Sequence, residues 1–343
     1  MFPHLPFAPI RSSLYTTAEL MSGLNPGDYL SFGRTPDFKC FEYFVAQGKA
    51  APRDALTSMM EALHDNSITQ ATLALLKRKS RVAAIMGGHD EPRDSAAYAS
   101  VAHIARALAR KGFLLASGGG PGAMEATHLG AFLSKQPEEN LTEAVKQLAR
   151  KCPNLPSNAS HVIKRDGSLD KDVLRQLHAW LTPAYSFSQT IEHPGESLAV
   201  PTWYYGQEPT SPFATHIAKY FQNSLREDGL ITLAAHGIVF ASGKAGTLQE
   251  IFQDSVRNYY RLPNDPFSPM VFWGKRYWTR TLPVVKVLEA LFTKNDRAKD
   301  YQQYVLITDD EAEAVDFLFT KAPPAKAHVV RLEALGMLKK GNP

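Results

Sequence analysis

Three glycine-bearing stretches stand where an open parallel sheet would bind a ligand. They are Gly87-Gly88 after the apolar run 81–86, Gly118 to Gly122 after 113–117, and Gly243 to Gly246 after 237–241. Ligands of such sheets sit beyond the carboxyl ends of the strands, where glycine lets the backbone approach a phosphate and helix N-termini favour the anion. The three stretches therefore predict a ligand that carries phosphate.

The second stretch also fits a dinucleotide fingerprint, because Gly118 to Ala123 reads G-x-G-x-x-A. In that fold an acidic residue about 20 positions later closes the next strand. Here the distance falls on Glu138-Glu139, in a polar segment, so an NAD dehydrogenase is the weaker alternative. A Walker A loop around Lys244 is excluded by Ala245, which stands where Ser or Thr must reach magnesium.

The third stretch continues into Thr247-x-x-Glu250. That spacing is typical of a capping box, in which the two side chains satisfy free backbone donors at a helix start. A carboxylate one turn beyond a phosphate loop could equally act on the ligand. Both interpretations of Glu250 stay open at this point, a helix cap and a catalytic or ligand-contacting group. Among the histidines, His89 is the candidate for contact with a ligand, because it follows Gly88.

Two motifs carry a resemblance to a known family. "GGGPGAMEA" and the downstream "GTLQE" resemble the paired motifs of the LOG family of nucleoside 5′-monophosphate phosphoribohydrolases, long described as lysine decarboxylases. The chain is especially similar to the larger bacterial purine and pyrimidine nucleotide 5′-monophosphate nucleosidases of that superfamily. The resemblance covers about residues 81–132 and 198–320. It implies hydrolysis of a nucleoside 5′-monophosphate to free base and ribose 5-phosphate, a homodimer or higher homo-oligomer, and neither a metal nor a redox cofactor.

The resemblance also implies a set of site residues. Glu250 would support attack of water at the ribose, since a carboxylate can stabilise positive charge at an anomeric carbon. Arg226 would be its electrophilic partner. The monophosphate would lie on Gly243, Lys244, Ala245, Gly246 and Thr247. The rest of the nucleotide pocket would be lined by Gly87, Gly88, Ser117, Gly118, Gly119, Gly120, Gly122, Met124 and Glu125.

Two departures from the family pattern favour a second hypothesis. Ser242-Gly243-Lys244 replaces Pro-Gly-Gly, and a lysine would be strained there if the backbone needs a positive φ. The family's arginine, counted back from Glu250 without gaps, would fall at Glu227 or Asp228, one position after Arg226. The alternative to catalysis is a nucleotide sensor or carrier that binds the same ligand without cutting it.

The elements that must position these residues alternate between strand and helix. Buried apolar runs at 81–86, 113–117, 197–204, 237–241, 269–273 and 304–307 predict strands. Helical patterns between them predict a doubly wound, Rossmann-like, mostly parallel sheet with helices on both faces. Residues 1–78 are expected to form a helical extension, 79–330 the nucleotide-binding domain, 134–196 a helical insertion that could serve as a lid, and 331–343 a tail.

Composition excludes several classes of function. The 343 residues are 44% hydrophobic and carry a net charge of +4. Basic residues are scattered except for Lys77-Arg78-Lys79 and Arg81, which are typical of a helix C-terminus, so we expect no nucleic-acid partner. No apolar run approaches the roughly 20 residues of a membrane helix, and the N-terminus lacks the pattern of a signal peptide. Cys40 and Cys152 are far apart, which suggests neither disulfide nor zinc site and favours the cytoplasm.

Overall fold

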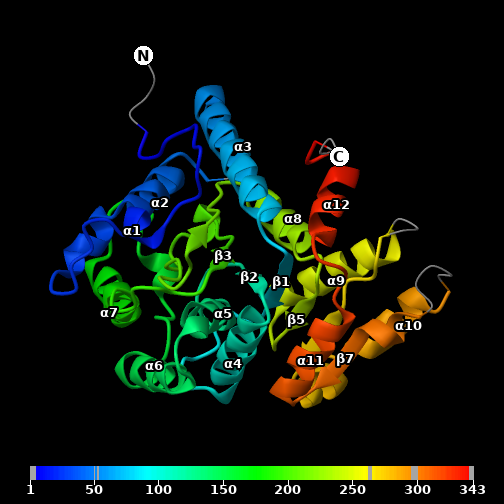
Figure 1. Cartoon of the computed structure of the whole chain (residues 1–343). Helices are drawn as coiled ribbons and strands as arrows, with labels where there is room; N and C mark the ends of the chain where they lie inside the picture. The colour runs from blue at the N-terminus through cyan, green and yellow to red at the C-terminus, as the bar shows by residue number, and fades with distance from the viewer. Residues whose placement is uncertain (1–4, 50, 52–53, 262–264, 295–299, 340–343) are drawn as a thin grey trace.

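A parallel sheet forms the centre of the molecule in this computed structural model, which describes residues 5–49, 51, 54–261, 265–294 and 300–339 (Figure 1). Within those residues the sheet has seven strands in the order β4-β3-β2-β1-β5-β6-β7. The strands are β1 (Arg81–Met86), β2 (Phe113–Ser117), β3 (Ser197–Ala199), β4 (His216–Ile217), β5 (Ile238–Phe240), β6 (Met270–Trp273) and β7 (Val305–Thr308). The predicted doubly wound, Rossmann-like class is confirmed.

The chain reverses its direction across the sheet between β1 and β5. From β1 it proceeds outward through β2, β3 and β4, then returns to pair β5 with the other edge of β1. The crevice at such a switch point is where open α/β sheets hold their ligands. The glycine stretches after β1 and β5 lie at this point, and the stretch after β2 lies beside them, on the strand next to β1.

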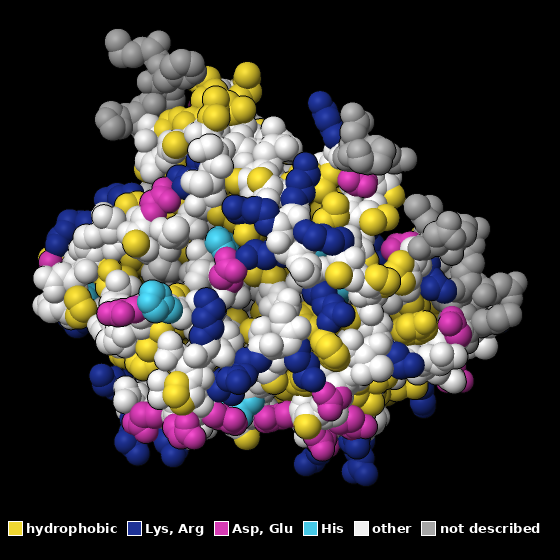
Figure 2. Space-filling view, in the orientation of Figure 1, with side chains coloured by type: hydrophobic (Ala, Val, Ile, Leu, Met, Phe, Trp, Pro, Cys, Tyr) yellow, Lys and Arg dark blue, Asp and Glu magenta, His cyan; other side chains and the backbone are white. Residues whose placement is uncertain are grey.

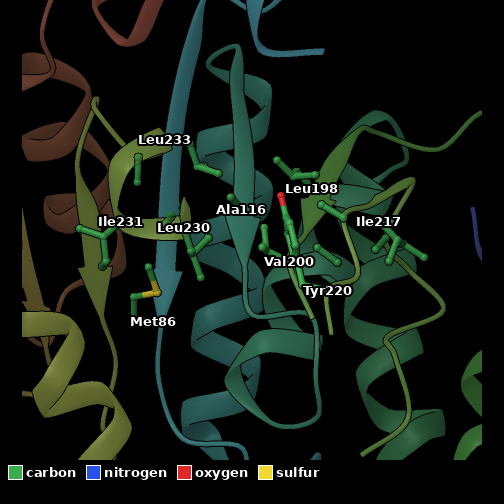
Figure 3. Packing of buried hydrophobic residues seen from close by; sticks show 14 of the residues in the cluster. Met86, Ala116, Leu198, Val200, Ile217, Tyr220, Leu230, Ile231 and Leu233 are labelled. Carbon is green, nitrogen blue, oxygen red and sulfur yellow. The ribbon is translucent and has the colours of Figure 1, made fainter. Parts of the chain in front are cut away.

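Alternate residues of β1 belong to two different cores. Val82, Ala84 and Met86 pack on one face of the sheet, and Ala83 and Ile85 on the other. A strand covered on both faces is apolar throughout, which explains why a continuous run predicted it to the residue. Figure 3 shows the first face, where Met86, Ala116 and Leu198 lie against leucines and an isoleucine of α8 (Asn223–Leu233).

Helices cover both faces of the sheet. The face of Ala83 and Ile85 packs against α4 (Ala96–Arg110), α5 (Ala123–Phe132) and α11 (Glu311–Lys321). The opposite face packs against α3, α8, α9, α10 and α12, and the bounds not yet given are α3 (Ala55–Lys77), α9 (Ala245–Tyr259), α10 (Val284–Phe292) and α12 (Ala327–Ala334). The resulting three layers are those of the expected architecture.

The N-terminal segment shares the core of the sheet. It contains α1 (Thr17–Leu20), α2 (Pro36–Ala46), α3 and the 3₁₀ helix η1 (Tyr29–Arg34). Asp37 of α2 forms a buried ion pair with Lys219, 2.7 Å apart, and accepts a 2.9 Å hydrogen bond from the indole of Trp203. Because a buried charge needs its partner, the pair fixes the extension against the loops that follow β3 and β4.

The segment 134–196 contains the two helices predicted for it, α6 (Glu138–Lys151) and α7 (Lys171–Ser188). The structure differs from expectation in several places. The strand predicted over 197–204 ends at Ala199, and the 3₁₀ helix Trp203–Tyr205 follows it. The two-residue edge strand β4 lies where a helical or irregular stretch was expected, because so short a strand leaves no periodic signal. The predicted tail boundary at 330/331 cuts through α12, whose Leu332 is buried. No helix in the described residues is long and apolar enough to cross a membrane.

Candidate functional site

Backbone hydrogen bonds join the three glycine stretches to one another. The amide of Gly88 donates to the carbonyl of Ser242 at 2.9 Å, and the carbonyl of Gly88 accepts from the amide of Ala123 at 3.0 Å. A methyl group placed on Gly87 would lie 2.8 Å from the Cβ of Ala123, so only glycine allows the approach. Gly87 and Gly88 therefore hold the loops together, and the amide of Gly88 is already committed to protein.

The stretch after β2 is a buried, internally braced turn. Ser117 accepts from the amide of Gly119 at 3.1 Å, and its hydroxyl lies 2.8 Å from Nε2 of His128. Burial lowers the pKa of His128 to about 3, so its imidazole is neutral at physiological pH. Gly119 and Gly122 have φ of +75° and +67°, where a side chain would be strained. Ser117 thus holds the backbone of the turn in place through its hydroxyl group.

Glu125 has partners other than a ligand. Its carboxylate is completely buried and accepts two 2.7 Å hydrogen bonds from Arg93 and one of 3.0 Å from Tyr98. Both carboxylate oxygens are thereby occupied, so the sequence assignment of Glu125 to the nucleotide-binding set is not supported by its contacts. Its role is to tie α5 to the loop that follows β1.

The stretch after β5 is open to solvent and begins a helix. Lys244, Ala245 and Gly246 are exposed, and the first amides of α9 lie at this end, where an isolated helix leaves them without partners. Lys244 has a φ of −103°, so the strain that its replacement of glycine suggested is absent. Its ammonium lies 2.5 Å from Asp90, across the crevice, and this contact raises the pKa of Lys244.

The capping-box interpretation of Thr247 and Glu250 was wrong. Helix α9 begins at Ala245 with Lys244 at the N-cap, and no side chain caps it. Glu250 is therefore in the second turn, too far along to reach the N-cap amide. Thr247 is buried with its hydroxyl packed against Gly243, where a methyl group would lie 2.1 Å from Oγ1.

Arg226 and Glu250 come from the neighbouring helices α8 and α9. The Nε of Arg226 donates to the carbonyl of Val200 at 3.0 Å, and a methyl group on Gly118 would lie 2.1 Å from its Nη2. Burial raises the pKa of Glu250 from 4.5 to about 7, while the charge of Arg226 opposes the rise and that of Glu227 adds to it. The guanidinium thus lies over the buried glycine turn and within electrostatic reach of Glu250.

The other glycines of the turn also pack closely against neighbouring residues. Gly119 approaches Ala199 so closely that a methyl group would lie 2.7 Å from its Cβ. Met124 covers both Gly118 and Gly120, with its Sδ and methyl carbon 2.6 and 2.9 Å from methyl groups placed on the two residues. Met124 is partly exposed, and its thioether forms an apolar border beside Arg226.

A cavity of about 330 Å³ opens beside this turn, between the sheet and the insertion. Its wall on the sheet side includes His89, Asp90, Pro121, Gly122 and Glu208. The insertion supplies residues 153–157, Ala159, Ser160 and Trp180. Arg93 fixes that wall, since its Nη1 donates to the carbonyls of Cys152 and Trp180 at 3.2 and 2.9 Å. The insertion therefore borders the candidate site, as a lid would.

Sequence reasoning missed Glu208, Arg93 and Asp90. Glu208 and Arg93 lie in loops with no motif, and their partners are remote in the chain, so no local pattern could have found them. Asp90 gave a weak signal, two residues after Gly88.

The groups that a dinucleotide site or a metal site would need are not found in the described residues. No acidic residue follows β3 directly, where a dinucleotide fold would place its ribose ligand, because Val200 and Pro201 stand there. The described residues contain no cluster of three or more His, Cys, Asp and Glu that could hold a metal.

The sequence of this chain matches no protein-family model and no curated protein. The resemblance drawn from "GGGPGAMEA" and "GTLQE" thus stays a hypothesis.

Proposed function

We propose that this protein hydrolyses the N-glycosidic bond of a nucleoside 5′-monophosphate, giving the free base and ribose 5-phosphate. The monophosphate lies at the exposed N-terminus of α9, on the backbone of residues 243–246. Free amides and the helix dipole stabilise an anion at such an end. Lys244, already beside this end, adds a positive charge.

Glu250 and Arg226 act at the ribose in this proposal. The Glu250 carboxylate accepts a proton from water as the water oxygen bonds to C1′ and the bond from C1′ to the base nitrogen breaks. Positive charge grows on the sugar in that transition state and a nearby carboxylate stabilises it. A pKa of about 7 suits a general base at neutral pH. Arg226, held by Val200, orients the ribose over Gly118.

The proposal rests chiefly on the place of Arg226. Its guanidinium lies against the first glycine motif and acts electrostatically on the glutamate of the second. In sequence the two motifs are more than a hundred residues apart. A glycine turn with only a structural role would need neither Arg226 nor Glu250 beside it.

Release of base from nucleotides tests the proposal. Purified protein is incubated with AMP, GMP, IMP, CMP and UMP, and free base is separated and quantified. Glu250→Gln and Arg226→Gln are expected to lower the rate by about 100-fold or more. Asp228→Asn is the matched control, because Asp228 also lies on α8 but bonds Gln253 instead. The absence of base release from every nucleotide would refute hydrolysis.

A second candidate is a sensor or carrier of the same nucleotide. The observation that favours it is the ion pair of Lys244 with Asp90, which directs the lysine to a neighbouring loop. Calorimetry would then show saturable binding of a monophosphate, with the nucleotide recovered intact after prolonged incubation.

We also propose that the protein is a homo-oligomer. Leu56, Met59 and Leu63 are 39 to 63% exposed along the first turns of α3, and hydrophobic side chains gather at this upper end in Figure 2. Contiguous apolar surface of this kind is typical of a protein interface. Light scattering would give a mass above one chain for the wild type and a lower mass for Met59→Asp.

A further inference from the structure

Glu208 extends over the same glycine turn as Arg226. It follows the 3₁₀ helix η4 (Trp203–Tyr205), and its amide donates to the carbonyl of Tyr205 at 2.9 Å. A methyl group placed on Gly120 would lie 3.2 Å from its Oε2. Glu208 and Arg226 therefore reach the turn at Gly120 and Gly118, two residues apart.

The N-terminal extension fixes the loop that carries Glu208. Gly206 packs so tightly on Phe41 of α2 that a methyl group would lie 2.3 Å from its ring. Trp203 donates its indole N–H to Asp37, and its amide to the carbonyl of Tyr220. These contacts fix the backbone of the loop that carries Glu208, and a fixed backbone favours the preorganisation that a catalytic group requires.

The carboxyl group of Glu208 faces the cavity that the insertion walls. His89 lines the same cavity. No hydrogen bond to the Glu208 carboxyl group is found within the described part of the chain. Burial raises the pKa of Glu208, while His89 and Arg226 oppose the rise. Tyr205 is also within electrostatic reach of it. Asp90, Glu91 and Arg93 complete the charged groups of the cavity.

Resting on the proposed function, we propose that Glu208 is the acid that protonates the departing base, which occupies the cavity beside it. The C1′–N bond breaks with its electron pair moving to the base, and the Glu208 carboxyl proton passes to a ring nitrogen. Water meanwhile gives its oxygen to C1′ and a proton to Glu250. One water is consumed, and the two carboxyl groups regain their starting states by exchange with solvent.

Two carboxyl groups with divided roles are what cleavage of a glycosidic bond calls for. A base expelled as an anion is a poor leaving group, so its protonation lowers the barrier. The two carboxyl groups lie next to different parts of the proposed substrate. Glu250 lies on α9, near the helix N-terminus that would bind the phosphate, and Glu208 lies on the wall of the cavity that would hold the base. Arg226 acts electrostatically on both.

A substrate whose leaving group needs no proton can distinguish a catalytic acid from a residue that only supports the fold. The wild type, Glu208→Gln and Glu250→Gln are assayed with the best natural nucleotide and with 4-nitrophenyl ribofuranoside 5-phosphate, whose nitrophenolate leaves unprotonated. Glu208→Gln is expected to lower kcat about 100-fold on the nucleotide and less than about threefold on the nitrophenyl substrate. Glu250→Gln lowers kcat on both. The alkaline limb of the pH profile, visible with the nucleotide, is lost in Glu208→Gln.

Controls keep the outcomes apart. Asp228→Asn, whose carboxylate bonds Gln253 away from this cavity, should leave both rates near wild type, and a melting curve verifies that Glu208→Gln folds. Equal losses on the two substrates would overturn the assignment, as would a selective loss in His89→Gln with Glu208→Gln unaffected. Wild-type protein that cleaves neither substrate refutes the proposed hydrolysis itself, whereas cleavage by the wild type with equal losses in Glu208→Gln refutes only the role of Glu208.

Discussion

The glycine turn after β2 and the glycine loop after β5 have similar sequences and opposite surroundings. Gly118 to Gly122 are buried, with two glycines at positive φ and Ser117 bracing the turn. Lys244 to Gly246 are exposed, and a methyl group on Gly246 would meet nothing within 4 Å. Close packing surrounds the glycines of the first, whereas in the second it surrounds Gly243 and leaves Gly246 open to solvent.

This difference separates the tasks of the two motifs. The buried turn sets the positions of Met124, Arg226 and Glu208, whose side chains lie over its glycines. The exposed loop presents a helix N-terminus to solvent. Changes in the turn should therefore act on folding or on the reaction, and changes in the loop on ligand affinity.

The largest contrast is expected between Gly122→Ala and Gly246→Ala. A methyl group on Gly122 would lie 2.3 Å from the carbonyl oxygen of Gly88 at a φ of +67°. We expect a loss of roughly 3 kcal/mol or more in the free energy of unfolding. Gly246→Ala, in the first turn of α9, should change it by less than about 1 kcal/mol. Urea denaturation measures both, and similar losses would remove the distinction between the two regions.

Glu250→Gln should alter stability in a pH-dependent way. The folded-state pKa of about 7 lies above the ordinary 4.5, so ionising Glu250 costs folding free energy as pH rises through that window. The glutamine variant should match the wild type below pH 4.5 and gain up to about 3 kcal/mol above pH 7. Urea titrations at pH 4 and pH 8 test this, and an equal difference at both values would contradict it.

Gly118→Ala should damage the reaction more than the fold. Its methyl group would meet the ends of two flexible side chains, Arg226 at 2.1 Å and Met124 at 2.6 Å, which can move aside. We expect base release to fall about 100-fold, as for loss of one positioned donor. The melting temperature should stay within a few degrees of wild type. A large loss of stability with normal specific activity would reverse this assignment.

Lys244→Ala should have the smallest effect on stability. Its ion pair with Asp90 is exposed on both sides, and water and salt screen such pairs so that they contribute little to stability. Affinity for a monophosphate should fall several-fold, and more at low salt than at high salt, because exposed charges are screened. Titration of AMP at two salt concentrations measures it. Unchanged affinity would mean that the backbone alone holds the phosphate.

The sequence predicted those features that depend on neighbouring residues in the chain, such as buried strands and the glycine loops after them. Strands covered on both faces are continuous apolar runs, so β1 and β2 were found to the residue, and the glycines that follow them marked the carboxyl ends of these strands. It failed where a contact joins distant segments. The carboxylate of Glu125 looked available in its motif, but Arg93, 32 residues earlier, occupies it.

Helix starts were the other source of error. Thr247-x-x-Glu250 satisfies the capping pattern, yet α9 begins two residues before Thr247 because the loop after β5 is so short. In α3 the apolar residues at helical spacing divide between core and surface, since Met60 is buried while Leu56, Met59 and Leu63 are exposed. Polar residues such as His64 and Asp65 are buried instead, since Asp65 accepts from the amides of Phe221 and Gln222. Hydrophobicity alone gives no sign of such a contact.

The bonds of Arg93 bear on how the site could select its substrate. Swinging the insertion away would break three hydrogen bonds that Arg93 donates to backbone carbonyls of the insertion. Freeing Arg93 itself would leave the Glu125 charge buried without its partner, at a cost of several kcal/mol. We therefore expect the wall of the cavity to keep its shape during the proposed reaction. Discrimination between purine and pyrimidine would then depend on the size of the cavity, and the substrate would enter over the exposed N-terminus of α9.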